Sequence, residues 1–500
     1  MRNMNERLQQ LINEAPLFKP SVPEGVEAIV LDSEDLDEVT AAYVKQSNVE
    51  YKYNSFDGMS IFSGGKYQLV TNIKEVRLHI RKFLARCRIL KKKAGLVPLA
   101  RKTNGFISDM IETLCSLLDV HLLPSQKAPC SLDGSLDPQK IIAANNCLIS
   151  IEEYPFVIYP ITNQFYTHNY LEYDYLPNAR SELWELFITQ ICIGDIDMAL
   201  LLQQWCGYLL MPTLKYQKFL LCAGDGANGK GVFFDTIAVA LGKNNVSNVS
   251  LVRFIDKHTL FGTYGKLANM SNENTQDLES AAEGIIKEYV AGDKVLWEQK
   301  YKDPFFAYPT AKLMFACNEL PRIRDDSDGM WRRMMLVPFK AKFTGDECDI
   351  NMAKKLQEPK ELSGILNWML RGAVSLMVNE EFVKCDAAAK ELNEYRDNSN
   401  TVRLFLNDNI ELDKPGGEVQ IPCSKLHKWY SDWCAENGFK PKNNINFGHG
   451  IFGMFGPIHC VQSSVSKSRI WINGKKINVY LGLRPQAGST VEYELANWKP

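Results

Sequence analysis

A short apolar run, a glycine-rich loop with a lysine, and a second apolar run stand together at residues 218–241. The first run predicts a buried strand, and the periodicity of residues 232–241 predicts a helix. Glycines let such a loop approach a polyphosphate closely, while backbone N–H groups and the helix N-terminus point at the negative charge. The segment therefore predicts a phosphate-binding loop of the P-loop kind. The loop comprises Gly224, Asp225, Gly226, Ala227, Asn228, Gly229, Lys230 and Gly231.

Lys230 is expected to reach the β- and γ-phosphates of a nucleotide. The spacing alone is weak evidence, because it arises by chance in roughly one chain of this length in seven. The loop also departs from the usual form, since Gly231 stands where a Ser or Thr hydroxyl would bind Mg²⁺. The segments on either side of the loop therefore decide its meaning.

Length and composition describe an ordinary protein of several domains. The chain has 500 residues, of which 45% are apolar and 23% charged, and its net charge is −2. A uniformly basic nucleic-acid coat is excluded, so contacts with nucleic acid must come from local patches. Thirteen scattered cysteines, an N-terminus without an apolar signal and no long apolar run favour a cytoplasmic protein outside the membrane.

The first 180 residues predict two units. Residues 1–50, with a helix-like start and an acidic run, are expected to form a small appendage. Residues 51–180 are expected to form an α+β domain, with hairpins at 51–70 and a helix at 76–93. The basic end of that helix, from Arg88 to the lysines at 91–93, is either a solvated helix end or a DNA contact.

A second apolar strand, at residues 266–270, precedes Glu273. An acid at a strand end beside a P-loop can hold Mg²⁺ through water or polarise the attacking water, so Glu273 is the expected metal-binding and catalytic acid. Asp277 and Glu279 lie nearby and could take this role instead. Glu273 could also be an ordinary loop carboxylate without a catalytic role.

Residues 295–308 predict a β-hairpin with a basic and aromatic tip at Lys300, Tyr301 and Lys302. Such a tip can bind phosphate and stack on bases, and it would then be a DNA-binding element. Lysines on a hairpin also protect exposed strand edges from aggregation, which is the structural alternative.

A third strand, at residues 312–317, ends at Asn318, whose side chain can orient a nucleophilic water or cap a turn. Several arginines follow. Arginine suits contacts with phosphate, and one supplied by a neighbouring subunit can stabilise charge in phosphoryl transfer. Ion pairing with Asp325, Asp326 and Asp328 is the structural alternative. The arginines are Arg322, Arg324, Arg332 and Arg333.

The order of these segments resembles the superfamily-3 helicases, specifically the phage and plasmid primase-helicase family that includes the poxvirus primase-helicase. Residues 224–230 are similar to the family's GxGxNGK loop, and residues 308–321 and 331–339 resemble its later motifs. Residues 50–215 and the region around 426–439 resemble its flanking regions, so roughly 450 residues are covered. Because no long polymerase-like segment precedes the helicase-like part, the family's primase domain is not expected in this sequence.

This resemblance implies an α/β fold with an AAA+-like P-loop ATPase core at residues 181–397. ATP would bind between adjacent subunits with Mg²⁺, held by Lys230 and the loop, with Asn318 sensing the γ-phosphate. Arg333, with Arg332 as the alternative, would act on the neighbour's nucleotide. The family also implies a ring, a hexamer with 3′-to-5′ polarity, that moves on single-stranded and forked DNA.

Residues 398–500 are expected to form a winged-helix DNA-binding domain. Twelve Lys and Arg residues against eight Asp and Glu residues give this region a net charge of +4. A helix near residues 424–436 and a strand-like segment at 468–476 fit helices followed by a β-hairpin wing. A small protein-interaction domain is the alternative.

Two other functions remain open. The chain could be a DNA-binding replication initiator or loader with weak ATPase activity, or a P-loop enzyme acting on small molecules. A separate primase or origin-binding protein is a possible partner of the helicase. The basic hairpin distinguishes the DNA-dependent functions from the small-molecule enzyme, because only a protein that acts on DNA needs the hairpin for its activity.

Overall fold

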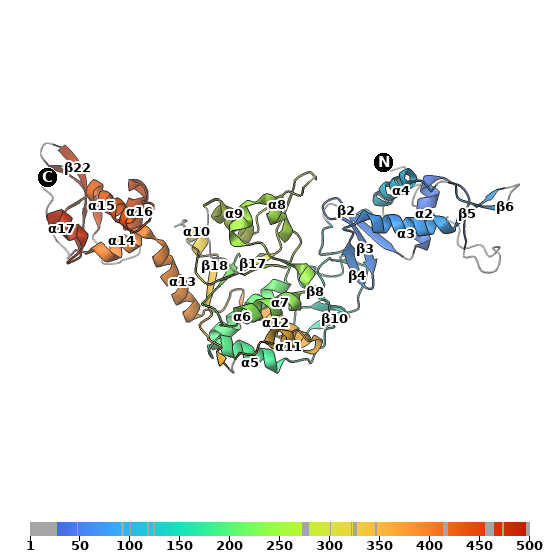
Figure 1. Cartoon of the computed structure of the whole chain (residues 1–500), viewed down its shortest axis with the longest axis horizontal. Coiled ribbons are helices and arrows are strands. Elements are labelled where there is room, and N and C mark those ends of the chain that lie inside the picture. Colours follow the sequence, from blue (N-terminus) through green and yellow to red (C-terminus); the bar gives the residue numbers. More distant parts are fainter. Residues whose placement is uncertain are drawn as a thin grey trace.

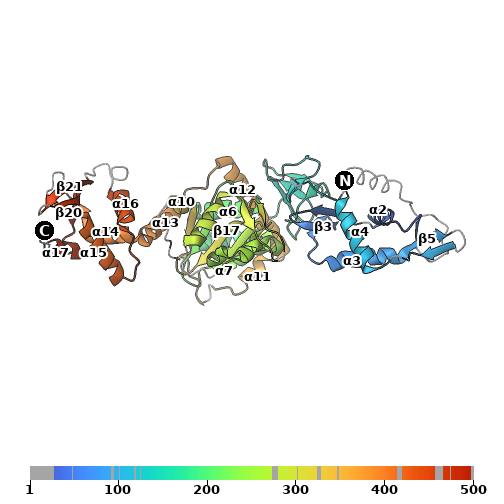
Figure 2. The same cartoon turned by 90° about the horizontal axis from the view of Figure 1, so that it is seen from above.

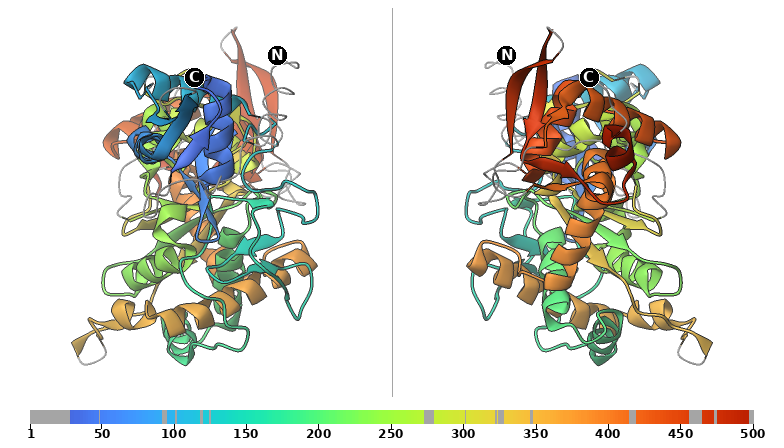
Figure 3. Two further views of the ribbon diagram at one scale, coloured as in Figure 1. Left: turned by 90° about the vertical axis from the view of Figure 1, so that its right-hand side faces the viewer. Right: turned by 90° about the vertical axis from the view of Figure 1, so that its left-hand side faces the viewer.

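The structure, a computed structural model, describes residues 28–47, 49–91, 95–100, 102–117, 120–123, 126–272, 280–300, 302–321, 323, 328–345, 348–413, 419–455, 465–472 and 475–496. The chain forms N-terminal, central and C-terminal parts along one long axis (Figures 1 and 2). Both end parts lie on the side of the central part where α8 (Lys257–Leu260) and α9 (Ser280–Ala291) lie (Figure 1). Seen end-on, they overlap above the central part (Figure 3).

The described residues of the N-terminal part form two small sheets and three helices. One sheet has the order β1-β5-β6 and the other β2-β3-β4. Residues 28–47 contribute buried side chains to the same core as residues 51–120, so the boundary expected near residue 50 does not separate two cores. The elements are β1 (Ile29–Leu31), α2 (Leu36–Gln46), β2 (Glu50–Asn54), β3 (Gly58–Ser63), β4 (Lys66–Leu69), α3 (Ile73–Arg86), β5 (Cys87–Lys91), β6 (Gly95–Pro98) and α4 (Asn104–Ser116).

Helix α3 ends at Arg86, so the prediction of a helix through residue 93 is wrong beyond that point. The next residues form β5, in which Cys87 and Ile89 are buried and Leu90 and Lys91 are exposed. This alternation is typical of a strand with one buried face, and parallel pairing with β1 satisfies its extended backbone. The hairpins expected at residues 51–70 are confirmed as β2, β3 and β4.

Residues 126–180 connect the N-terminal part to the centre. Five short strands lie here, and Ile142, Ile149, Tyr173 and Tyr175 pack into the core of the central part. Strands β8 and β9 therefore belong by packing to the region that follows, whereas Tyr166 on β11 packs with Tyr67 and Leu122 of the N-terminal part. The five strands are β7 (Cys130–Ser131), β8 (Ile141–Ala143), β9 (Leu148–Ser150), β10 (Val157–Tyr159) and β11 (Phe165–Tyr166).

A five-stranded parallel sheet organises the central part, in the order β13-β14-β17-β12-β18. Parallel sheets are buried on both faces, which is why the three strands predicted beside and after the glycine-rich loop are continuous apolar runs, and all three are confirmed. The strands are β12 (Phe219–Ala223), β13 (Val246–Ser247), β14 (Ala268–Ser271), β17 (Lys312–Cys317) and β18 (Met334–Pro338).

Helices cover both faces of this sheet. Alternate strand residues such as Leu220 and Met314 pack under α5, α6, α7 and α12, whereas Leu221 and Phe315 pack under α9 and the segment at 251–255. Helices α6 and α12 approach so closely that a Cβ on Gly207 would lie 2.1 Å from the Ala373 backbone nitrogen. The helices are α5 (Glu182–Ile191), α6 (Ile196–Leu210), α7 (Lys230–Leu241), α11 (Met352–Leu356) and α12 (Pro359–Asn379).

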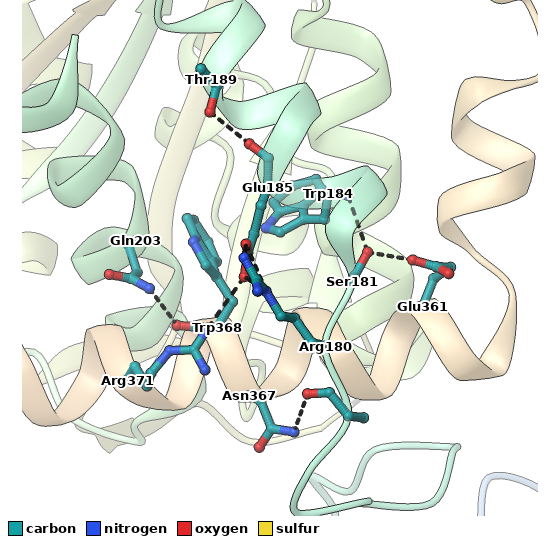
Figure 4. A network of polar contacts seen from close by, with 11 residues as sticks. Arg180, Ser181, Trp184, Glu185, Thr189, Gln203, Glu361, Asn367, Trp368 and Arg371 are labelled. Atoms are coloured by element: carbon teal, nitrogen blue, oxygen red, sulfur yellow. Dashed lines mark hydrogen bonds and ion pairs between the residues drawn. The ribbon is translucent and has the colours of Figure 1, made fainter. Parts of the chain in front are cut away.

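A polar network fixes the chain where it enters this helical layer (Figure 4). The Arg180 guanidinium binds the Glu185 carboxylate, which also lies 3.7 Å from Nη2 of Arg371 on α12. Asn367 Nδ2 donates to the Ala179 carbonyl at 2.9 Å. The linker ahead of α5 is thus held against α12, beside the buried Trp184.

Helix α13 (Asp386–Ser399) leads from the centre to the C-terminal part (Figure 1). There, three helices precede a hairpin, β21–β22, whose second strand also pairs with the short β20. The helix expected at residues 424–436 is confirmed as α15. The elements are α14 (Thr401–Asn409), β19 (Ile410–Leu412), β20 (Ile421–Pro422), α15 (Cys423–Glu436), α16 (Asn444–Phe455), β21 (Ser466–Ile472), β22 (Lys475–Leu481), β23 (Leu483–Pro485) and α17 (Thr490–Ala496).

Within the described ranges, no helix combines the length and apolar character that crossing a membrane requires. The cysteines in those ranges are free thiols, and most of them are buried. They behave as small apolar core residues rather than as covalent links between the parts.

Candidate nucleotide and DNA site

The glycine-rich loop joins the central strand β12 to the N-terminus of α7. Gly229 caps that helix in the left-handed conformation, at φ 84°. A Cβ there would lie 2.7 Å from Cγ2 of Ile191, so both the backbone angle and the packing require glycine. The loop thus carries the chain tightly from the sheet into the N-terminus of a helix, the end of a helix that attracts an anion.

Two further residues hold the loop in this shape. Asn228 Oδ1 accepts from the Lys230 backbone N–H at 3.2 Å, and Asn228 Nδ2 donates to the carbonyls of Asp225 and Phe339. A Cβ on Gly224 would lie 2.3 Å from the Phe339 carbonyl oxygen. Asn228 and Gly224 are therefore structural parts of the loop, whereas Asp225, Gly226 and Ala227 form its exposed tip.

Lys230 lies at the centre of the site. Its Nζ contacts the Gly224 carbonyl and lies 3.3 Å from Oδ1 of Asn318, at the end of the neighbouring strand β17. Burial lowers the pKa of this amine, and the nearby Cys222, Cys317 and Asp225 oppose that shift. The structure therefore brings Lys230 and Asn318 together at one edge of the sheet.

Gly231 lies in open space, because a Cβ added there meets no heavy atom within 4 Å. We expect Gly231→Ser to fold normally and to keep ATP hydrolysis, with half-saturation at a lower Mg²⁺ concentration because the hydroxyl adds a metal ligand. Gly229→Ser is the matched control and should lose the loop geometry, since it combines a positive φ with a 2.7 Å contact. Titration of hydrolysis with Mg²⁺ checks both; a folded but inactive Gly231→Ser protein would contradict the expectation.

Glu273, the expected metal-binding acid, lies outside the described residues, as do Asp277 and Glu279. Its strand, β14, ends at Ser271 on the same edge of the sheet as Asn318, because β14 and β17 run in parallel. In the part of the chain that the structure describes, no three His, Cys, Asp or Glu residues gather as a metal site. The role of Glu273 stays a prediction.

A cavity of about 250 Å³ opens beside the loop. Its apolar walls come from α5, α7, α11 and the segment after β18, and the Phe343 backbone N–H donates to the Ala227 carbonyl at 2.8 Å. A base or sugar can be enclosed here next to phosphates on the loop. No sequence pattern predicts these residues as a site, because they come together from distant segments. The apolar ones are Phe187, Val232, Phe343 and Met352.

The expected hairpin is confirmed as β15 (Val295–Trp297) paired antiparallel with β16 (Phe305–Ala307). Lys300 and Lys302 are exposed at its tip, and Tyr301 lies outside the described residues. Trp297 is fully buried, and its Nε1 donates to the Ala307 carbonyl at 3.1 Å. A rigid base thus presents two lysines to solvent.

The N-terminal part contacts the base of this hairpin. The Phe56 ring lies 5.4 Å from the Phe305 ring, and the Tyr264 hydroxyl donates to Asp57 at 2.9 Å. Tyr264 in turn lies 5.3 Å from both Trp297 and Phe305. The turn between β2 and β3 therefore braces the hairpin.

Arg332 and Arg333 lie just before β18, at the opposite end of the sheet from the loop. Arg333 pairs with the start of β12, whose five residues span roughly 16 Å before the loop begins. Arg332 is exposed, whereas Arg333 Nη1 donates to the Gly329 carbonyl at 2.7 Å, and burial beside Arg332 lowers its pKa. Within one chain, neither arginine meets Lys230. Arg322 and Arg324 lie outside the described residues.

Residues 222–333 match a family model described as "Family of unknown function (DUF5906)". A "Putative helicase" of Acanthamoeba polyphaga mimivirus is 25% identical over 252 residues, covering 44% of this chain and 25% of that protein. A "Putative primase" of African swine fever virus is 23% identical over 329 residues, covering 59% of this chain and 33% of that protein. The chain thus spans a quarter to a third of the length of these relatives.

A "Putative helicase" of Invertebrate iridescent virus 6 is 24% identical over 188 residues, covering 31% of this chain and 19% of that protein. Among solved structures, the apo NrS-1 C-terminal region superposes with a TM-score of 0.47 at 10% identity, covering 89% of this chain and 98% of that chain. The relatives are named as helicases and primases of large DNA viruses, which confirms the resemblance to the primase-helicase family.

Proposed function

We propose that this chain is an ATP-dependent DNA helicase that acts in the replication of a phage, plasmid or other mobile element. The observation that carries the proposal is the 3.3 Å approach of Lys230 Nζ to Asn318 Oδ1, between the glycine-rich loop and the next strand end. A cation on the loop and an amide at the adjacent strand suit a γ-phosphate and its attacking water. The helicase names of the viral relatives support the same class.

The loop fits the phosphates of ATP. Gly229 and the start of α7 offer backbone N–H groups, Lys230 offers a cation, and the adjoining cavity has room for a nucleoside. Mg²⁺, when bound, would neutralise charge on the phosphates. With glycine at position 231, no side chain of the loop replaces the usual hydroxyl ligand, so water and Glu273 would complete the metal's ligands.

The arginines favour a site shared between subunits. Arg332 and Arg333 are separated from the loop of their own chain by the length of β12, roughly 16 Å. Their guanidinium groups are therefore better placed to reach a nucleotide bound to a neighbouring subunit than one bound to their own loop. A head-to-tail contact of this kind repeats, and it forms a ring when its rotation closes. We therefore propose a ring of six subunits, the number that the family resemblance implies, around single-stranded DNA.

The hairpin and the C-terminal part provide the proposed DNA contacts. Lys300 and Lys302 project from the braced hairpin, which would move with the ATP cycle along the strand. In the C-terminal part, three helices followed by β21–β22 suit a winged helix. Trp471 on this hairpin is 68% exposed, with Lys476 Nζ 5.6 Å from its ring, a combination that suits phosphate and base contacts.

Charge reversal at the hairpin tip tests the proposal. We expect Lys300→Glu with Lys302→Glu to remove stimulation of ATP hydrolysis by single-stranded DNA and the unwinding of forked DNA, because both phosphate contacts become repulsive. Lys360→Glu with Lys384→Glu makes the same charge change at exposed positions elsewhere and should retain both activities.

Steady-state hydrolysis, fork unwinding and the mass of the assembly are the measurements. Ring formation with tight ATP binding but no unwinding by the wild-type protein would favour an initiator or loader instead. DNA stimulation that survives the hairpin variant would contradict the role of Lys300 and Lys302. Hydrolysis that DNA never stimulates would favour an enzyme acting on small molecules.

A further inference from the structure

A dense basic segment lies in the N-terminal part, far from the glycine-rich loop. Residues 73–91 contain seven Lys and Arg residues against a single Glu, inside a chain whose net charge is −2. They form α3 and β5, at the end of the molecule that points away from the central part (Figures 1 and 2). The sequence left open whether this charge is merely solvated.

The fold gathers this charge on one face of α3. Val76, Ile80 and Phe83 are buried against the N-terminal core, so the opposite face turns to solvent. Lys74, Arg81 and Lys82 are exposed and separated by seven and eight residues, a spacing that places them on one side of a helix. Arg77 lies at the edge of this face. We call Lys74, Arg77, Arg81 and Lys82 the basic face.

The positive charge of this face is uncompensated. No ion pair joins these four side chains to a carboxylate in the ranges that the structure describes. Arg77 instead donates to the Ser108 hydroxyl at 2.8 Å, and Arg81 to the Asn104 amide oxygen at 2.6 Å. These neutral partners on α4 orient the two guanidinium groups without cancelling their charge.

The helix carries this charge at a cost to its own stability. Arg77 and Arg81 are four residues apart, an arrangement in which like charges destabilise a helix. The carboxylates on the two helices are Glu75 on α3 itself and Asp109 and Glu112 on α4. A face that was only solvated would gain from alternating charges, so the arrangement favours an anionic ligand.

The strand that follows extends the same charge. Arg88 Nη1 donates to the carbonyls of Ala85 and Cys87 at 2.8 and 2.9 Å, which holds its guanidinium at the C-terminal end of α3. Lys91 is exposed farther along β5. The cations therefore run along a 14-residue helix, about 21 Å long, and continue onto a strand.

We propose that the basic face of α3, extended by Arg88 and Lys91, binds the phosphate backbone of duplex DNA. Phosphates along one edge of a duplex match a row of cations of this length. The exposed large apolar side chains of the described segment are aliphatic, namely Ile73, Leu78 and Leu90. No Phe, Tyr or Trp is exposed among the described residues 73–91, so the surface lacks the large aromatic rings on which single-strand binding proteins stack unpaired bases. The site is distinct from the hairpin tip and does not depend on ATP hydrolysis.

The test replaces the two lysines that hold no structural hydrogen bond. Lys74→Gln with Lys82→Gln in the full chain should weaken binding of a blunt duplex equally for two unrelated sequences, measured without nucleotide. Loss of two phosphate contacts should lower the slope of log affinity against log salt concentration by about 2, at about 0.9 per contact. Lys360→Gln with Lys384→Gln, at exposed positions, is the matched control and should leave the slope unchanged.

Two results would overturn the proposal. One is an unchanged salt slope and duplex affinity in the variant. The other is loss of binding to phosphatidylserine vesicles while duplex binding is kept, which would assign the basic and aliphatic surface to a membrane. Hydrolysis stimulated by single-stranded DNA should survive in the variant, so failure of this site and failure of the helicase function give different patterns.

Discussion

Replacing Lys230 with alanine should lower the turnover number for ATP hydrolysis by about 100- to 1,000-fold, the range seen when one preorganised charge-stabilising group is removed. Lys230 is buried, and its Nζ lies between the Gly224 carbonyl and Asn318. No other lysine or arginine stands among the residues that line the cavity beside the described loop. Developing negative charge on the phosphates would therefore lose the cation that the loop's own subunit supplies.

Lys243, just beyond the far end of α7, supplies the control. It is exposed, so Lys243→Ala makes the same chemical change without touching the loop. Phosphate release with and without single-stranded DNA gives the activities, and thermal unfolding verifies that both variants fold. If a folded Lys230→Ala protein kept a turnover number within tenfold of the wild type, the proposed catalytic role of the loop would be wrong.

The sequence predicts most of the central sheet because each strand there is buried on both faces. The run at residues 312–317 is apolar after Lys312 and predicts a buried strand, and β17 has those limits. The glycines of the loop were predictable from the motif alone. The structure gives the reasons that glycine is needed, since Gly224 lies against the Phe339 carbonyl and Gly229 has a positive φ.

Features that depend on distant partners were not predictable. Strand β5 looked helical because Cys87 to Lys91 contain ordinary helix-forming residues, and only pairing with β1 makes them extended. The cavity beside the loop combines Phe187, Phe343 and Met352, which come from three segments. The bracing of the hairpin by Phe56 and Asp57 likewise spans more than 200 residues of sequence.

The N-terminal bracing also links the two proposed DNA contacts. The turn that contains Phe56 and Asp57 touches the base of β15–β16, while the basic face lies on α3 of the same part. A duplex bound on α3 and a single strand bound at the hairpin tip would then both be held by parts of the protein that contact each other. Such an arrangement would favour unwinding, because a duplex held in place resists being pushed ahead of the moving subunits.

Mixing two inactive proteins should restore ATP hydrolysis if the arginines act across a subunit boundary. Arg333→Ala alone should lower turnover by about 1,000-fold or more, the effect of losing an arginine that stabilises phosphoryl transfer. Arg333 lies at the opposite end of β12 from the loop, roughly 16 Å along the strand, so in the proposed ring we expect the loss to occur at the neighbouring subunit's site.

In a ring assembled from equal amounts of Lys230→Ala and Arg333→Ala chains, each shared site draws its lysine and its arginine from two different subunits. About one quarter of the sites then combine an intact Lys230 with an intact Arg333, so hydrolysis should recover to about a quarter of the wild-type rate. Action within one chain predicts no recovery. Repeating the mixture with Arg332→Ala identifies the acting residue, since Arg332 is exposed while Arg333 is partly held by the Gly329 carbonyl.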